Sequence, residues 1–211
     1  MFNKEVFLRS YNRRDIFEEL NPDIKTVDAA KRLPGTSNVL NMTADILNGL
    51  ENIPLMPYTL YREFEVKGTR NGYQDPYFLK RSRLAAMVVH TVFGGRNDLG
   101  DRINDYLWSI CEETVWVLPA HKNIGIDLAA TETSLMLAEI LRLLDTVIPA
   151  EIHERVTHEI YTRVLNPYIE NPQSYWWNKK ENINNWCGVC NGKIGATLLH
   201  LEEDTDKLVA G

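Results

Sequence analysis

Residues 128–144, LAATETSLMLAEILRLL, carry the clearest structural signal in this sequence. Their apolar residues recur at intervals of seven and then three, which places them on one face of an α-helix. These residues are Leu128, Leu135, Ala138, Leu141 and Leu144. A helix with one apolar face needs other elements to cover it.

The segments on either side are also helical in pattern. Pro149 suits a first helical turn, and apolar residues then recur every fourth position through Val164. Upstream, residues 99–116 are amphipathic, and residues 83–93 are apolar almost all round, as in a buried helix.

Two shorter signals complete the pattern. Residues 58–66 form a short mixed segment that Gly68 ends, and a last helix is predicted from about Asn185 to Leu201. No segment alternates convincingly between apolar and polar residues, as a half-buried strand would. The sequence therefore predicts an all-α protein.

Two kinds of helix alternate along the chain. Those beginning near positions 81, 127 and 185 are apolar or rich in small residues, whereas those near 58, 100 and 150 are amphipathic. A stack of antiparallel helix pairs, with a buried inner layer and a half-exposed outer layer, gives this alternation. We expect a partial (α/α) toroid over residues 56–211, although a plain α-solenoid or an irregular bundle would give nearly the same pattern.

The first part of the chain, residues 1–55, is expected to be an arm of short helices packed onto the rest of the chain. Asn21-Pro22-Asp23 and Pro34-Gly35-Thr36 are turn signals. Thr43 is expected to cap a short helix, whose apolar residues are Ile46, Leu47 and Leu50.

Composition excludes several classes of protein. The chain has 211 residues, 44% of them hydrophobic and 25% charged, as in soluble globular proteins. Its net charge of −6 argues against broad nucleic-acid binding, and its longest apolar run, residues 84–93, is too short to span a membrane. The start has no signal-peptide pattern, so a cytoplasmic location is expected for the sequence as written. A longer N-terminus with an export signal would instead make the protein periplasmic or secreted.

Three connections should lie on one face, because each leads from an outer helix to the next inner one: residues 68–80, 117–127 and 166–184. The second and third are long for helix connections, which often indicates function. In and beside them are candidate sugar-binding residues, whose rings would stack on a pyranose and whose polar groups would bond its hydroxyls and carboxylates. The candidates are Trp116, His121, Tyr175, Trp176, Trp177, Lys179 and Trp186. Alternatively, tryptophans that flank helices fill the core.

Asn184 and Asn185 begin the last predicted helix and have two interpretations. An amide oxygen could cap the helix. Amide donors at the positive end of the helix could instead hold an anion such as a carboxylate.

The segment Trp186-Cys187-Gly188-Val189-Cys190 is close to the thioredoxin active-site motif, but only helical signals precede it. Packing is therefore the favoured role of Cys187 and Cys190. Glycines at 188, 192 and 195 predict a small helix face that a neighbouring helix or a ligand approaches closely. No metal site and no cofactor are expected, because neither zinc-ligand spacing nor a phosphate-binding glycine loop is present.

Several of these segments, in this order, resemble the N-terminal region of heparinase II/III-like polysaccharide lyases. The resemblance extends from about Tyr58 to Leu201. It depends on Tyr61-Arg62-Glu63-Phe64 and on residues 77–85, 108–113, 116–121, 127–133 and 184–192.

The resemblance implies an α/α toroid followed by β-sandwich domains, in an enzyme that cleaves acidic polysaccharides by β-elimination. Asn184 is similar to the family's carboxylate-neutralising residue, whereas Asn185 stands where a histidine often follows. The family's catalytic tyrosine, a further histidine and the β-sandwich domains lie downstream. We therefore expect an incomplete toroid part that binds acidic oligo- or polysaccharide and is inactive alone. The alternative is a non-catalytic α/α carbohydrate-binding or scaffold module.

Overall fold

The computed structural model describes residues 24–181 and 184–201, and every element in these two ranges is helical. The α-helices are α2 (Ile24–Lys31), α3 (Pro34–Ala44), α4 (Tyr58–Tyr61), α5 (Glu63–Lys67), α6 (Asn71–Val92), α7 (Gly100–Cys111), α8 (Leu128–Leu143), α9 (Ala150–Ile160), α10 (Asn166–Glu170) and α11 (Asn185–Leu201). A π-helical turn, Tyr161–Leu165, joins α9 to α10. Short 3₁₀ turns lie at Asp45–Leu47, Asn97–Leu99, Pro119–His121, Pro172–Ser174 and Trp176–Asn178. The all-α prediction is confirmed.

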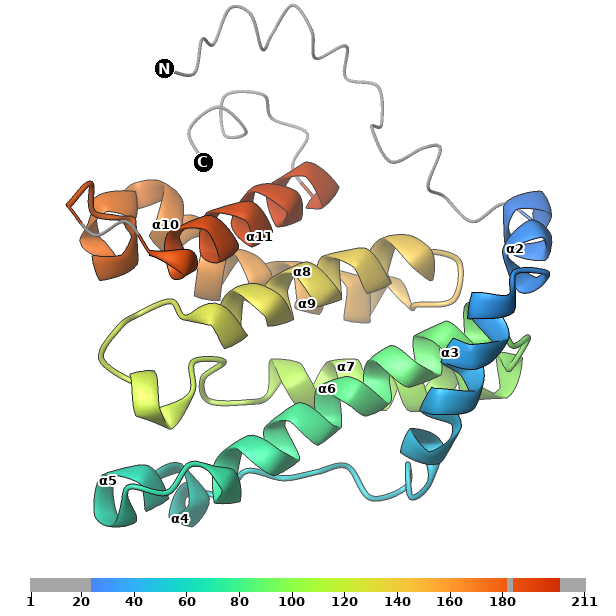
Figure 1. Ribbon diagram of the computed structural model, residues 1–211, viewed down its shortest axis with the longest axis horizontal. Coiled ribbons are helices and arrows are strands. Elements are labelled where there is room, and N and C mark those ends of the chain that lie inside the picture. The colour runs from blue at the N-terminus through green and yellow to red at the C-terminus, as the bar shows by residue number, and fades with distance from the viewer. Residues whose placement is uncertain (1–23, 182–183, 202–211) are drawn as a thin grey trace, which may run out of the picture.

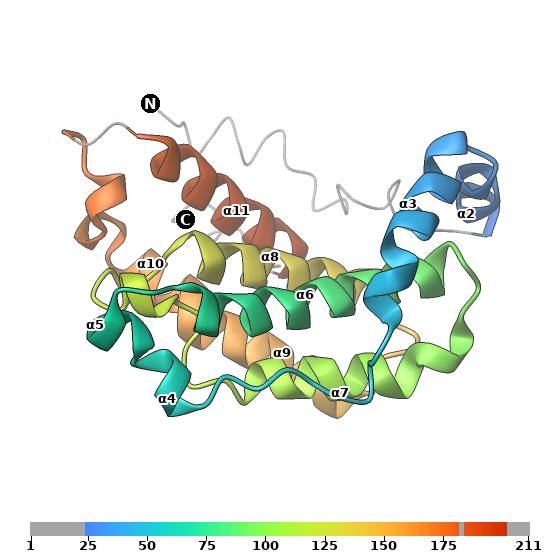
Figure 2. The ribbon, with the colours of Figure 1, turned by 60° about the horizontal axis from the view of Figure 1, so that its bottom comes forward.

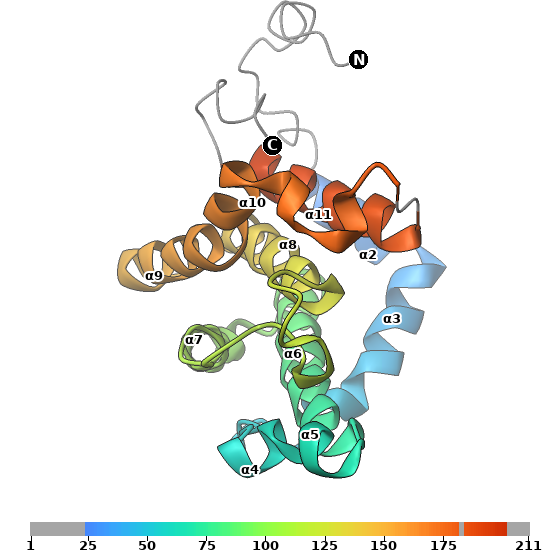
Figure 3. The same ribbon diagram turned by 90° about the vertical axis from the view of Figure 1, so that its left-hand side faces the viewer.

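The long helices form two rows (Figure 3). Helices α6, α8 and α11 lie side by side in one row, with α8 in contact with both neighbours. Helices α7 and α9 contact each other in the second row and pack on α6 and α8 respectively. Along the chain from α6 to α9, consecutive long helices run in opposite directions (Figure 1).

The connections between the rows gather at the two ends of the molecule. Helices α4, α5 and α10 lie at one end together with residues 112–127, whereas α2 and α3 lie at the other (Figures 1 and 2). This confirms that the connections leading into α6, α8 and α11 emerge on one face. Within the described residues, no helix is long and apolar enough to cross a bilayer.

Helix α6 begins about ten residues earlier than the sequence predicts, so the first connection is only Gly68–Arg70. Gly68 ends α5 in the left-handed conformation, at φ 72°. The early part of α6 buries polar side chains, such as those of Lys80 and Arg81, which obscures its helical periodicity. Pro76 lies beyond the first turn of the helix, where proline removes one backbone hydrogen bond, and the helix nevertheless continues to Val92.

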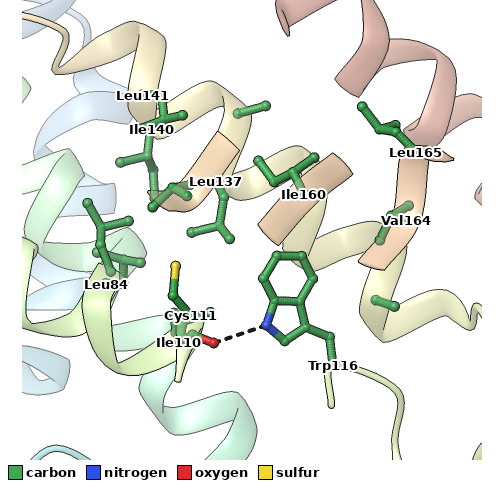
Figure 4. Close-up of a cluster of buried hydrophobic side chains, with 14 of the residues drawn as sticks. Leu84, Ile110, Cys111, Trp116, Leu137, Ile140, Leu141, Ile160, Val164 and Leu165 are labelled. Carbon is green, nitrogen blue, oxygen red and sulfur yellow. Dashed lines mark hydrogen bonds between the residues drawn. The ribbon is translucent and has the colours of Figure 1, made fainter. Parts of the chain in front are cut away.

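A single large core joins both rows. Trp116, which is 2% exposed, lies against side chains from α8, α9 and the π-helical turn (Figure 4). Its indole N–H donates to the carbonyl oxygen of Ile110, at 3.0 Å. The guanidinium group of Arg163 lies 5.1 Å from the centre of the Trp116 ring. These contacts fix the chain where it leaves α7.

The described part of the arm packs on α6, as expected. The guanidinium group of Arg83 donates to the carbonyl oxygens of Asn48 and Asn52, at 2.9 and 2.8 Å. Thr43, however, lies near the end of α3 and caps no helix: its hydroxyl donates to Val39 O, at 2.8 Å. That prediction is wrong because Pro34 begins a helix here, in the position where proline lacks only an unused N–H. The turn predicted at residues 21–23 falls outside the described residues.

Candidate functional site

Asp127 organises the connection between α7 and α8. Its side chain is fully buried and caps α8, since Oδ1 accepts a hydrogen bond from the backbone N–H of Ala130, at 2.8 Å. The other oxygen, Oδ2, accepts from the N–H of Leu118, at 3.1 Å, and lies 2.9 Å from Nδ1 of His121. Because Asp127 engages Nδ1, the second ring nitrogen of His121 is the one directed away from the carboxylate.

Two tryptophans from later in the sequence form a series of ring contacts that begins at this histidine. The ring of Trp186, in the first turn of α11, meets His121 edge-on with centroids 5.1 Å apart. The ring of Trp176 lies 5.3 Å from that of Trp186, and its side chain is 39% exposed. The second and third predicted loops therefore converge. We refer to His121, Asp127, Trp176, Asn184 and Trp186 as the His121 cluster.

Asn184 caps α11. Its amide oxygen accepts hydrogen bonds from the backbone N–H groups of Trp186 and Cys187, at 2.9 and 3.3 Å. This orientation turns the amide nitrogen away from the helix end. Asn185 is exposed in the first turn of the same helix.

The remaining predicted aromatic residues are buried. Trp177 is fully buried and donates its indole N–H to Ile126 O, at 3.0 Å, which fastens the third connection to the second. Tyr175 is only 7% exposed and stacks on Trp177, with centroids 5.2 Å apart. The prediction of exposed stacking surfaces is therefore wrong for Trp116, Tyr175 and Trp177. These rings supply the apolar contacts that long connections need in order to fold against the helices.

The lysines near the site differ in their surroundings. Lys179 is exposed, directly after the 3₁₀ turn that holds Trp176. Lys122, next to His121, forms an ion pair with Glu65 of α5, at 2.8 Å, which links the second connection to the helix before the first.

A buried polar network behind the site was not predicted. The hydroxyl of Tyr77 donates to Trp116 O, at 2.8 Å, and lies 3.0 Å from the hydroxyl of Thr133. Arg81 donates to that same threonine hydroxyl, at 2.8 Å, and pairs with Glu113, also at 2.8 Å. These contacts give the five residues a role in positioning residues 112–127. The only sign of this network in the sequence is that polar residues occur within helices that are expected to be buried.

The structure agrees with the prediction that Cys190 is a packing residue, but not with the prediction for the glycines of α11. Cys190 is fully buried, and burial raises the pKa of its thiol to about 11, which keeps it protonated at neutral pH. The prediction of a neighbouring helix against the glycine face is wrong for the described residues, because a Cβ atom built at Gly188, Gly192 or Gly195 meets no described atom beyond its own helix turn within 4 Å. Among the described residues, no group of three or more His, Cys, Asp and Glu side chains is placed to hold a metal ion.

Comparison with known proteins gives no relative: no protein-family model and no curated protein matches the sequence.

Proposed function

We propose that the paired helices are part of the (α/α) toroid of a lyase that acts on uronate-containing polysaccharides by β-elimination, and that the His121 cluster binds the sugar. The observation that carries this proposal is an imidazole that a buried carboxylate orients and that the ring of Trp186 contacts, with the ring of Trp176 next to that of Trp186. The two rows of antiparallel helices support the toroid, since alternating inner and outer helices are what that fold requires.

The cluster has the components of an acidic sugar site. The half-exposed ring of Trp176 offers an apolar face for a pyranose. Lys179 adds a positive charge close by in the sequence, and the N-terminus of α11 adds a partial positive charge. Both favour a ligand that carries a carboxylate.

The same residues suit the proton transfer of β-elimination. His121 would accept the C5 proton of the uronate at Nε2, while Asp127 stabilises the resulting imidazolium. The electron pair of the C5–H bond then forms the C4–C5 double bond, the C4–O4 bond breaks, and O4 takes up a proton from water. His121 returns its proton to the resulting hydroxide, which regenerates the base. The resemblance assigns neutralisation of the carboxylate to Asn184. Because Asn185 cannot act as a base, we propose that His121 takes the role of the base. With the base supplied by His121, this chain should turn over substrate by itself, in contrast to the expectation from the family resemblance that it is inactive alone.

A non-catalytic sugar-binding module is the second candidate. The observation that favours it is the amide oxygen of Asn184, which is engaged in capping α11. This candidate keeps the sugar contacts of the His121 cluster and dispenses with the proton transfer.

One experiment separates the two candidates. The protein is mixed with heparin-derived, alginate and other uronate oligosaccharides, and both affinity and the ultraviolet absorbance of unsaturated uronate are recorded. We expect Trp176→Ala to weaken binding and His121→Gln to remove the absorbance signal while retaining most of the affinity. A matched control is Trp108→Ala, which changes a similarly exposed tryptophan on α7.

Binding without any absorbance signal would favour the non-catalytic module. Absence of binding to every uronate would contradict both candidates.

A further inference from the structure

A concave site separate from the His121 cluster lies between residues 55–61, α6 and the end of α7. It is a cavity of about 570 Å³, within the range of about 300 to 1,000 Å³ that is typical of small-molecule sites. It shares no residue with the His121 cluster. No motif in the sequence indicates this cavity, because its residues come from three separate segments.

The floor of the cavity contains buried charged groups. Lys80, which is 2% exposed, lies 3.1 Å from a carboxylate oxygen of Glu113 and donates to the hydroxyl of Ser109, at 3.0 Å. The guanidinium group of Arg81, which does not line the cavity, also forms an ion pair with Glu113, at 2.8 Å. Glu112, on the exposed side of the floor, adds a second negative charge. The positive charges of Lys80 and Arg81 equal the negative charges of the two glutamates, so the net charge of the four groups is zero.

This floor offers both donors and acceptors to a ligand. An ammonium group has three hydrogens, and the described contacts of Lys80 engage two of them. A carboxylate can accept about four hydrogen bonds, and Glu113 accepts three, one from Lys80 and two from Arg81. The hydroxyl of Ser109 can donate as well as accept. A group that both donates and accepts, such as a sugar hydroxyl, matches such a floor.

The walls of the cavity are aromatic. Tyr61 and Tyr73 meet edge to face with centroids 5.9 Å apart, and Tyr58 stands at the cavity with 70% of its surface exposed. Burial raises the pKa of Tyr73 to about 12, so its hydroxyl remains protonated and able to donate. Flat apolar faces beside hydroxyl groups favour a ring whose faces are apolar and whose edges are polar.

We propose that this cavity binds an uncharged pyranose unit, with its ring against the tyrosines and its hydroxyls on Lys80, Ser109 and Glu113. The charges of Lys80 and Arg81 cancel those of Glu112 and Glu113, so a ligand with net charge gains little attraction from this floor. The site is independent of the His121 cluster and does not require the lyase function.

The test is a nuclear magnetic resonance titration of the full chain with methyl glucoside, using the backbone amide signals of Thr114 and Val115, which line the cavity. Sodium glucuronate and tetramethylammonium chloride are the anionic and cationic comparison probes. We expect saturable shifts with methyl glucoside and weaker shifts with either ion. Tyr58→Ala and Ser109→Ala should each lower the affinity about five- to tenfold, as the loss of one stacking or hydrogen-bonding contact would.

Tyr58 is largely exposed, so its replacement should leave the fold intact. Trp176→Ala, in the other site, is the matched control and should leave the affinity for methyl glucoside unchanged. Shifts only with a charged probe, no shifts with any probe, or equal affinity in the cavity variants would each overturn the proposal. Loss of methyl glucoside binding in Trp176→Ala would also overturn it, by placing the sugar in the His121 cluster.

Discussion

At the scale of single residues, Asp127 has the most contacts to explain. It caps α8, holds the backbone of Leu118 and orients His121, all from a fully buried position. Its place at a helix start was predicted from the sequence, but its bond to His121 was not. The chain between the two is irregular, and no periodicity governs such a segment.

We predict that Asp127→Asn destabilises the protein. An asparagine has one acceptor oxygen where the carboxylate has two, and its NH₂ group would face a donor. The free energy of unfolding should fall by about 1–3 kcal/mol, as expected when a buried polar group loses its partner. Urea denaturation followed by circular dichroism measures this change. His121→Ala, which leaves both backbone bonds of Asp127 in place, should cost less, and a larger cost for His121→Ala would contradict this account.

A second residue-scale prediction concerns pH. Burial alone would raise the pKa of Glu159, but hydrogen bonds and charges from Arg163 and Arg155 outweigh it and hold the pKa below its usual 4.5. A carboxyl group whose pKa is lowered by folding stabilises the fold above the unfolded-state pKa, and this contribution disappears as pH falls through the folded-state pKa. The wild-type protein should therefore have a higher free energy of unfolding than Glu159→Gln, and this difference should be largest at neutral pH. The excess should shrink below pH 4.5. An excess that stays constant in denaturation series across this range would refute the assignment.

At the scale of elements, the glycines of α11 give a sharp test. A glycine inside a helix costs roughly 0.5–1 kcal/mol relative to alanine. A Cβ atom at Gly192 meets no described atom within 4 Å, so nothing described offsets that cost. Gly192→Ala should therefore raise the free energy of unfolding by about 0.5–1 kcal/mol, measured by thermal or urea unfolding.

The matched control for this substitution is Gly125→Ala. Gly125 has φ +84°, and its Cβ would lie 3.1 Å from the ring of Tyr175. A left-handed conformation costs about 1–2 kcal/mol for other residues, so this change should destabilise the protein. If Gly192→Ala destabilised the protein to the same extent, the conclusion that the space around Gly192 is open would be contradicted.

The long helices were largely predictable from the sequence. Helix α8 matches residues 128–144 almost to the residue, because its apolar face packs on its neighbours. The beginning of α6 was missed because its buried face includes Tyr77, Lys80 and Arg81, which bond one another and their neighbours instead of following an apolar pattern. Periodicity detects apolar burial and not polar burial.

At the scale of the whole molecule, alternating helix types predicted the two rows and the common end for the connections. The candidate site was predictable only in part. His121, Trp176 and Trp186 meet, whereas Trp116, Tyr175 and Trp177 are buried and hold the connections in place. Both sets consist of aromatic side chains in or beside the same two loops. Only packing decides which rings face outward, and packing depends on contacts between distant segments, such as Trp177 with Ile126.

The central claim is that the connections before α8 and before α11 form one sugar-binding site. A double-mutant cycle on uronate oligosaccharide affinity, with His121→Ala, Trp186→Ala and the double variant, tests it most directly. Residues that act in one site should be coupled by about 0.5–3 kcal/mol. The affinity of the double variant should therefore be only slightly lower than that of the single variant with the lower affinity. Losses that simply add, or no loss in either single variant, would contradict the claim.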